Sequence, residues 1–384
     1  MDEEIKTGSW SNRVYRIAVS VLFFLQGLCF ASWASRIPSI QQKLELSNAL
    51  LGAILFALPA GSMVSLLFSG MLIGKYGSKV MAAGSVLIYG SILPLVGFSD
   101  SPLALVMSLI LFGMAGNMAN IAINTQAIHV EEKYGRKIMA SFHGLWSLAG
   151  FVAAGVGTIM IGRAIEPSVH FSLISTIIVL TIFLVFHRLY PDVKRVVTRG
   201  KLFVKPDRHL LKLGLLAFGC MICEGTMFDW SGIYFQKVVK AERGWIGAGY
   251  TAFMCAMASG RFVGDWVANR FHFRRTILYS ALILTAGLLL AVTIPMVATA
   301  IAGFVLVGFG VSSMVPLIYS EAGKSKRVAP GMALTAVSSI GFFGFLLGPP
   351  LIGIVSGIFN LRIALAMVAL IGISIAVSMR RGKG

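Results

Sequence analysis

Two carboxyl groups lie inside a long apolar segment, where an ionised side chain is costly. Glu224 and Asp229 are the only two of the fifteen acidic residues that fall well inside an apolar run. An ionised Asp at the centre of a membrane helix costs about 2.5 to 3.5 kcal/mol, and desolvation favours the neutral acid. A carboxyl group that is dry in one state and hydrated in another can bind and release a proton. We therefore expect Glu224 and Asp229 to couple proton movement, unless a base such as Arg36 or Arg261 neutralises them permanently.

A stripe of amides occupies one face of an earlier apolar segment. Asn117, Asn120 and Asn124 are spaced by three and then four residues, which places them on one side of a helix. Such a stripe needs either hydrogen-bond partners on a neighbouring helix or a water-filled cavity. Both interpretations stay open. In a cavity the amides would suit an uncharged polar solute, because they donate and accept hydrogen bonds.

A second polar face begins the next apolar segment with His143, Trp146 and Ser147. We expect Trp146 to stack on a sugar ring or an aromatic ligand. His143 is expected near the cytoplasmic end of its helix, where a packing role is more common than a proton relay. The tryptophans near the ends of apolar segments, which we expect to anchor the membrane interface, are Trp33, Trp230 and Trp266.

Enzyme chemistry is not expected of this chain. The sequence has no P-loop, no H-E-x-x-H, no nucleophile elbow and no paired C-x-x-C spacing. Cys220 and Cys223 form a single C-x-x-C within an apolar segment, and we expect them to be small buried side chains rather than a metal or redox site. We expect no cofactor and no metal, and in the absence of a nucleotide-binding domain the energy source would be an ion or solute gradient.

These residues must be positioned by membrane helices, because the composition excludes a soluble domain. The chain is 57% hydrophobic and only 12% charged, against about 25% charged in soluble proteins. Apolar runs of roughly 20 residues, enough to cross a bilayer, fill nearly the whole sequence. The predicted fold is an all-α membrane protein with twelve spans, at residues 14–35, 47–72, 79–98, 102–127, 138–162, 169–187, 211–235, 245–268, 275–294, 298–319, 331–356 and 361–379.

The net charge of +18 is best explained by membrane topology. With both termini in the cytoplasm, 25 of the 33 Lys and Arg residues fall on the cytoplasmic side and seven on the other side, while Arg261 lies within a span. Loops rich in Lys and Arg resist translocation, so this split predicts cytoplasmic termini. No loop interleaves its bases with aromatic residues, and we expect no nucleic-acid partner.

A long basic break divides the chain into two similar halves. We expect a six-helix bundle at residues 1–187, a cytoplasmic linker at 188–210 and a second six-helix bundle at 211–384. Residues 30–35 align with 227–232, and residues 70–74 align with 260–264, in matching positions of the two halves. These two repeats predict duplication of a six-helix unit.

The segment at residues 70–79 resembles the signature G-x-L-x-D-R-x-G-R-K of the major facilitator superfamily. The resemblance covers the whole chain and implies a transporter with two pseudo-symmetric six-helix bundles. It also implies a gating role for the matching residues Gly70, Gly74, Lys75, Gly77 and Lys79, and for Arg261 and Asp265 in the second copy. Gly74 stands where the family usually has Asp, which puts the usual charge lock of the first half in doubt. The fifth span also lacks the proline of the antiporter motif, which lowers the expectation of drug export.

A finer resemblance rests on residues 34–40 and 224–231, which are similar to the YbjJ group of bacterial inner-membrane proteins, a branch related to the fucose permease. It implies a transporter of the bacterial cytoplasmic membrane. We expect a monomer that moves a small solute by alternating access, around a central site lined by the first, fourth, fifth, seventh, tenth and eleventh spans.

The leading prediction is proton symport of a polar or sugar-like solute. Glu224 would carry the proton, and Asp229, paired with Arg36, would act as an outer gate or a second proton site. The three asparagines, His143, Trp146 and Arg36 are the residues expected to bind the solute. Two alternatives remain open: proton-driven export of an amphipathic compound, and a receptor or scaffold that binds a ligand without transporting it. Permanent salt bridges at Glu224 and Asp229 would favour the last.

Overall fold

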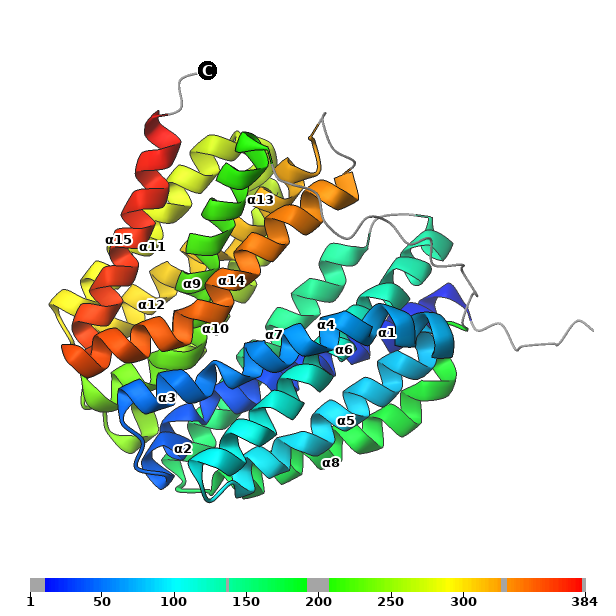
Figure 1. The fold of residues 1–384 in the computed structure, drawn as a ribbon, viewed down its shortest axis with the longest axis horizontal. Helices are drawn as coiled ribbons and strands as arrows, with labels where there is room; N and C mark the ends of the chain where they lie inside the picture. Colours follow the sequence, from blue (N-terminus) through cyan, green and yellow to red (C-terminus); the bar gives the residue numbers. More distant parts are fainter. Residues whose placement is uncertain (1–10, 136–137, 192–206, 326–329, 382–384) are drawn as a thin grey trace, which may run out of the picture.

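The computed structural model describes residues 11–135, 138–191, 207–325 and 330–381, with the backbone alone at 140, 264–270, 330–331 and 381. All regular structure in these ranges is helical (Figure 1). The first half contains α1 (Asn12–Ser35), α2 (Ile37–Lys43), α3 (Asn48–Leu55), α4 (Ala57–Tyr76), α5 (Ser78–Phe98), α6 (Pro102–Tyr134), α7 (Met139–Gly162), α8 (Pro167–Val185) and η1 (Phe186–Arg188). The second half contains α9 (Arg208–Lys237), η2 (Arg243–Trp245), α10 (Ala248–Arg270), α11 (Phe273–Thr293), α12 (Val297–Ser312), α13 (Met314–Ala322), α14 (Pro330–Ile358) and α15 (Leu361–Arg381).

The prediction of an all-helical membrane protein is confirmed. Eleven helical segments in the described residues are long and apolar enough to cross a bilayer, with α3–α4 and α12–α13 each forming one span. The eighth predicted span, 245–268, coincides with α10, whose sequence is more polar because it contains Arg261, Asp265 and Arg270. Helices are required here because the bilayer core offers no water to satisfy exposed backbone groups.

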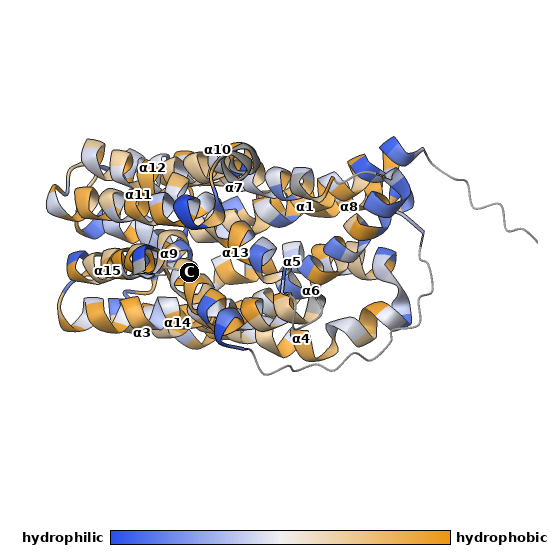
Figure 2. Ribbon diagram, turned by 90° about the horizontal axis from the view of Figure 1, so that it is seen from above, coloured by the Kyte–Doolittle hydropathy of each residue, from blue (hydrophilic) through white to orange (hydrophobic). Residues whose placement is uncertain are grey.

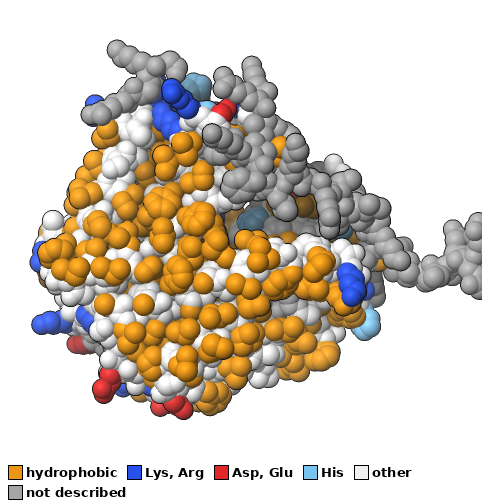
Figure 3. Space-filling view, viewed as in Figure 1, with side chains coloured by type: hydrophobic (Ala, Val, Ile, Leu, Met, Phe, Trp, Pro, Cys, Tyr) orange, Lys and Arg blue, Asp and Glu red, His pale blue; other side chains and the backbone are white. Residues whose placement is uncertain are grey.

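Local sequence signals begin several of these helices. The side chains of Ser47, Ser101 and Asp207 accept hydrogen bonds from backbone N–H groups in the first turns of α3, α6 and α9. Each cap satisfies a donor that the helix itself leaves unpaired. Figure 2 shows hydrophobic residues along the helices and hydrophilic residues gathered mainly near their ends, as a bilayer requires. Large hydrophobic side chains also cover the face seen in Figure 3, and Leu67 is 86% exposed.

The two groups of helices meet at one end and separate at the other (Figure 1). At the end that holds α2 and α3, here called the closed end, a Cβ added to Gly52 of α3 would lie 2.7 Å from the Cα of Gly353 of α14. Thr158 of α7 and Thr251 of α10 share a hydrogen bond of 3.0 Å between their hydroxyls. From there α4 diverges from α14, and Figure 3 shows a hollow between the bundles toward the opposite end, here called the open end.

The expectation that Trp33 and Trp230 anchor the membrane interface is wrong. Both indoles are fully buried, with 1% and 0% of their surface exposed, and they pack in the hydrophobic core. Both residues lie within their helices, and their neighbours cover them on every side. Trp266 and most of the predicted linker, residues 192–206, lie outside the described side chains and residues.

Candidate functional site

A buried ion pair lies in the middle of the second half. Glu224 of α9 accepts a hydrogen bond from Arg261 of α10, with 3.2 Å between Oε1 and Nη2. Glu224 is about 24 Å along a helix of about 45 Å, at 1.5 Å per residue. Its side chain is 10% exposed, and that of Arg261 is 22% exposed. The pair neutralises two charges that would each be costly alone at this depth.

Arg261 also reaches the first half of the molecule. Its Nη1 donates to Ser147 Oγ of α7 at 2.7 Å, and Ser147 Oγ donates in turn to the backbone carbonyl of His143 at 3.1 Å. The guanidinium carbon lies 5.6 Å from the ring centroid of Trp146, a cation–π contact. One side chain therefore connects the acid of α9 to the polar face of α7.

An aromatic cluster lies next to this polar group, toward the closed end. Phe30 of α1 stacks on Trp146 at a centroid distance of 6.1 Å and meets Phe228 of α9 edge-on at 5.4 Å. Phe228 is one turn beyond Glu224 on α9. It contacts three further rings edge-on, at 5.8 to 6.4 Å, from Tyr250, Phe253 and Phe345. The cluster therefore joins aromatic side chains of both halves.

The predicted pairing of Asp229 with Arg36 is wrong. Arg36 follows α1 at the closed end, is 2% exposed and donates through Nη2 to the carbonyl of Ile165 at 2.6 Å. No ion pair among the described residues joins it to Asp229, which is half-buried on α9. Burial lowers the pKa of Arg36 to about 10, with a smaller opposing effect of Glu166, so the guanidinium stays charged at neutral pH.

The three asparagines are partly engaged within the first half. Asn117 donates to Ser65 Oγ of α4 at 2.7 Å, which agrees with the interpretation of the stripe as interhelical contact. Asn124 donates to the backbone and side-chain oxygens of Asn120 at 2.8 and 3.0 Å. Asn120 is exposed and lies nine residues from Leu111, which is also exposed and is 180° around the helix, so the two side chains are on opposite faces of α6. Within the described chain no hydrogen bond joins these amides to Arg261.

His143 lies about one turn from the start of α7, near the open end, and is exposed. Its ring meets Phe23 of α1 edge-on at 5.2 Å. It touches the polar group through its backbone carbonyl, which accepts from Ser147.

The signature segment forms the connection between α4 and α5 at the open end. Gly77 has a φ of 86°, a conformation that favours glycine, and it ends one helix and begins the next. Lys75 and Lys79 lie over the rings of Tyr76 and Phe186, at 5.0 and 5.1 Å. Gly70 and Gly74 are exposed. In the second copy, Arg261 is part of the central polar group, and the side chain of Asp265 lies outside the described residues.

The cysteines form no cluster in the described chain. Cys29, Cys220 and Cys223 are buried and Cys255 is exposed, all as free thiols. Within the described residues no three His, Cys, Asp or Glu side chains are grouped so that they could hold a metal ion.

Sequence reasoning identified Glu224, Arg261 and Trp146 singly but not their assembly. It left the eighth span, α10, out of the central site, although α10 supplies Arg261, Tyr250 and Phe253. It also missed the aromatic cluster, because one phenylalanine in an apolar helix does not stand out. The available signal was the spacing of four residues between Glu224 and Phe228, which places both on one helix face.

The helices of the described residues form two groups, and polar side chains from both groups meet between them. The sequence profile of the Major Facilitator Superfamily matches residues 19–329. The chain belongs to this superfamily of secondary transporters, which are not enzymes.

Bacterial relatives cover nearly the whole chain. An uncharacterized MFS-type transporter of Yersinia pestis is 32% identical over 373 residues, which are 95% of each chain. The membrane protein MosC of Rhizobium meliloti is 33% identical over 362 residues, 94% of this chain and 88% of that one.

Solved structures share the fold at low identity. A mutant of the nucleoside transporter NupG has a TM-score of 0.78 at 13% identity and covers 95% of this chain and 99% of its own. The transporter FucP in the outward conformation has a TM-score of 0.64 at 17% identity, with 96% and 98% covered.

Proposed function

We propose that this transporter carries out proton-coupled uptake of a small polar or sugar-like solute across the bacterial cytoplasmic membrane. The proposal rests on the contacts of Arg261, which forms an ion pair with Glu224 of one half and a hydrogen bond with Ser147 of the other. A group that bonds across the boundary between two halves must change partners when the halves rock. The protonation state of Glu224 therefore decides how strongly Arg261 is held in the second half.

The ion pair corresponds to the stage after release of proton and solute. With the open end in the cytoplasm, water reaches the hollow between the bundles, and Glu224 is ionised beside Arg261. When the other side opens, a proton from the external medium neutralises Glu224 and breaks the pair. The freed guanidinium then has donors available for an incoming solute, and rocking carries both inward. Re-formation of the pair favours the ionised carboxylate and so drives proton release.

The solute would lie between the polar group and the hollow. Trp146 presents a ring for stacking on a sugar face, Arg261 supplies N–H donors, and Asn120 is exposed on the face of α6 opposite Leu111. His143 lies at the cytoplasmic approach to this site. Asn117 and Asn124 position the amide stripe through their contacts with Ser65 and Asn120. Asp229, which is half-buried on α9, is the second proton site of the proposal.

A second candidate, export of an amphipathic compound, is favoured by the aromatic cluster. Besides Trp146, the cluster contains the rings of Phe30, Phe228, Tyr250, Phe253 and Phe345. An apolar tail would fit against these rings while a polar head contacts Arg261. Symport is preferred because the charged side chains that the described residues place at the site form a net-neutral pair within a mixed polar and aromatic wall.

The chain would belong to the YbjJ group, act as a monomer, and have its gating segment at Gly70 to Lys79 together with Asp265. Residues 1–187 and 211–384 would rock as two bodies, joined by the linker at 188–210 on the cytoplasmic side with both termini.

The proposal is tested by finding the solute and the direction of its movement. Purified protein is screened for thermal stabilisation by sugars, organic acids and amphipathic cations, because a ligand of the folded state raises the unfolding temperature. The hit is then offered to proteoliposomes that are acidic outside. Accumulation of a polar hit inside supports symport, whereas accumulation of an amphipathic hit on the acidic side establishes export instead.

A further inference from the structure

A pocket at the closed end lies between the two halves. Its volume is about 300 Å³, the lower end of the range of small-molecule sites. One wall comes from the first half, at the turn between α1 and α2 and the turn between α7 and α8. The other comes from the end of α9 and from η2. The polar residues that line it include Arg36, Ser39, Gln42, Glu166, Gln236 and Arg243.

Arg36 reaches this pocket with most of its hydrogen-bonding capacity unused. The residue is 2% exposed, and only its Nη2 is bonded, to the Ile165 carbonyl. Its Nε and Nη1 are buried without a partner among the described residues. Buried donors of a charged group are costly to leave unpaired, so this arrangement favours an acceptor from outside the chain.

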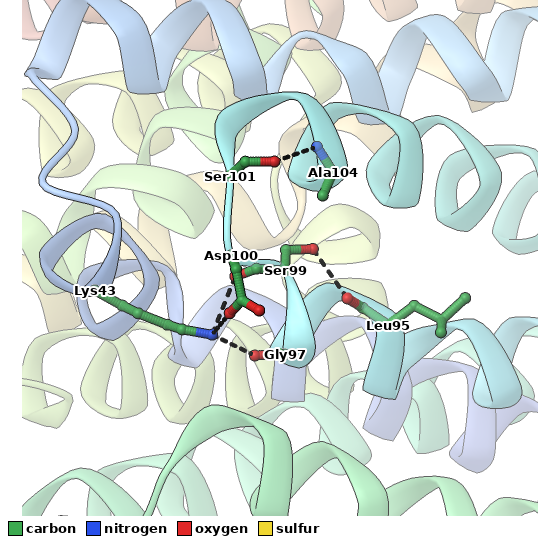
Figure 4. Close-up of polar contacts among 7 residues, drawn as sticks. All are labelled: Lys43, Leu95, Gly97, Ser99, Asp100, Ser101 and Ala104. Atoms are coloured by element: carbon green, nitrogen blue, oxygen red, sulfur yellow. Dashed lines mark hydrogen bonds and ion pairs between the residues drawn. The ribbon is translucent and has the colours of Figure 1, made fainter.

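The charge of the pocket favours an anion. Lys43 also lines it, but its ammonium group is occupied by Asp100 at 2.9 Å and by the carbonyls of Ser99 and Gly97 at 3.1 and 3.3 Å (Figure 4). That leaves Arg36 and Arg243 against the single carboxylate of Glu166. Two guanidinium groups present planar N–H donors that match the oxygens of a carboxylate or phosphate.

We propose that the closed-end pocket binds an oxyanion, either a small carboxylate or a phosphate group, and that the bound anion holds the two halves together at this end. Arg36 belongs to the first half and Arg243 to the second, so an anion that contacts both links them. The pocket rim is already bridged by Gln236 of α9, which donates to Gln42 of α2 at 3.2 Å. Opening of this end would separate the two arginines and lower the affinity for the anion. This inference does not depend on the proton coupling proposed above.

The test uses purified full-length protein and three sodium salts, acetate, phosphate and chloride, at equal ionic strength. Acetate or phosphate should raise the unfolding temperature above its value in chloride. Arg243→Gln should weaken the apparent affinity roughly tenfold, which corresponds to about 1.4 kcal/mol for one charged contact. Arg36→Lys, which keeps the charge but loses the planar fork, should weaken it as well. The matched control is Arg163→Gln, because Arg163 is exposed just after α7 and does not line the pocket.

A second readout follows the distance between the halves. Spin labels at Glu45 and Lys240, both exposed at this end, should report a narrower and shorter distance distribution in phosphate than in chloride. Arg243→Gln should abolish that difference. If all variants respond to the three salts as the parent does, or if acetate and phosphate act like chloride, the proposal is overturned.

Experiments in two lipid compositions distinguish a soluble oxyanion from the phosphate of a lipid. In nanodiscs of phosphatidylcholine, free phosphate should still act on the distance if the site takes a soluble anion. If a lipid phosphate fills it, nanodiscs with phosphatidylglycerol should shorten the distance in the parent protein but not in Arg243→Gln. Absence of both effects would overturn the proposal.

Discussion

At the scale of single residues, Arg261 distinguishes this site from a simple buried carboxylate. It is held by Glu224 at 3.2 Å and by Ser147 at 2.7 Å, and it lies 5.6 Å from the ring of Trp146. A buried ion pair adds little net stability, but removal of one partner leaves the other charge uncompensated. The two members of the pair should therefore be strongly coupled in mutational experiments.

Arg261→Gln should destabilise the protein by about 1 to 3 kcal/mol, a range reduced because Arg261 is partly exposed to the hollow. The double variant Glu224→Gln with Arg261→Gln should recover most of this loss, because no charge is then left unpaired. Thermal unfolding of the parent protein and the two purified variants measures both effects. A double variant that is less stable than the Arg261 variant would contradict the pairing.

The sequence was sufficient to identify Glu224 as a candidate, but it did not show which arginine pairs with it. A carboxylate within an apolar span is rare enough to be conspicuous, and Arg36 and Arg261 were both available to neutralise it. The choice depends on the packing of α9 against α10, which is a property of the tertiary structure. Because residues 260–264 repeat residues 70–74, the sequence pattern predicted a gating role for Arg261 and not a place in the central site.

At the scale of elements, the approach of α3 to α14 determines how tightly the closed end can close. Gly52 and Gly353 allow the two helix backbones to touch, and a Cβ at Gly353 would lie 2.8 Å from the Cα of Gly52. Close crossing at small residues is a usual way for membrane helices to associate.

Gly353→Val should therefore keep the two halves apart at the closed end. Spin labels at Glu45 and Lys240 should report a distance several ångströms longer than in the parent, by the rough size of an added side chain. Gly84→Ala is the matched control, because a Cβ at Gly84 of α5 meets nothing within 4 Å. Equal distances in both variants would show that the glycine contact does not control closure.

The spans were predictable from hydropathy, whereas their breaks were not predicted. The span α3–α4 breaks at Phe56 and the span α12–α13 breaks at Ser313, in each case three residues before a proline, Pro59 and Pro316. A proline lacks the N–H donor and clashes with the carbonyl four residues earlier, which explains both positions. Both prolines are visible in the sequence, but a prediction from hydropathy alone does not detect the break that a proline causes.

At the scale of the whole molecule, the two bundles are joined at the closed end by hydrogen bonds between side chains of opposite halves. Gln236 donates to Gln42 at 3.2 Å, and Lys237 donates to Asn48 at 2.9 Å. The described ranges contain no ion pair across this end. Neutral and singly charged contacts of this kind can be exchanged for water at low cost, as a rocking mechanism requires.

The orientation of the molecule gives a further prediction. A fluorescent protein fused after Gly384 should fluoresce in bacterial cells, because the proposed topology places the C-terminus in the cytoplasm with the excess of Lys and Arg. Alkaline phosphatase fused at the same position should be inactive. The reverse pattern would invert the topology and would place the open end outside.

The central claim is that Glu224 couples solute movement to protons, and it is tested most directly by comparing gradient-driven uptake with exchange. In proteoliposomes, Glu224→Gln should lose all stimulation of uptake by an acidic exterior. It should keep exchange of labelled for unlabelled solute, since the neutral amide mimics the protonated acid. Glu321→Gln, which removes the ion pair with Lys324 away from the central site, should behave as the parent protein does. Uptake by Glu224→Gln that still follows the proton gradient would contradict the mechanism.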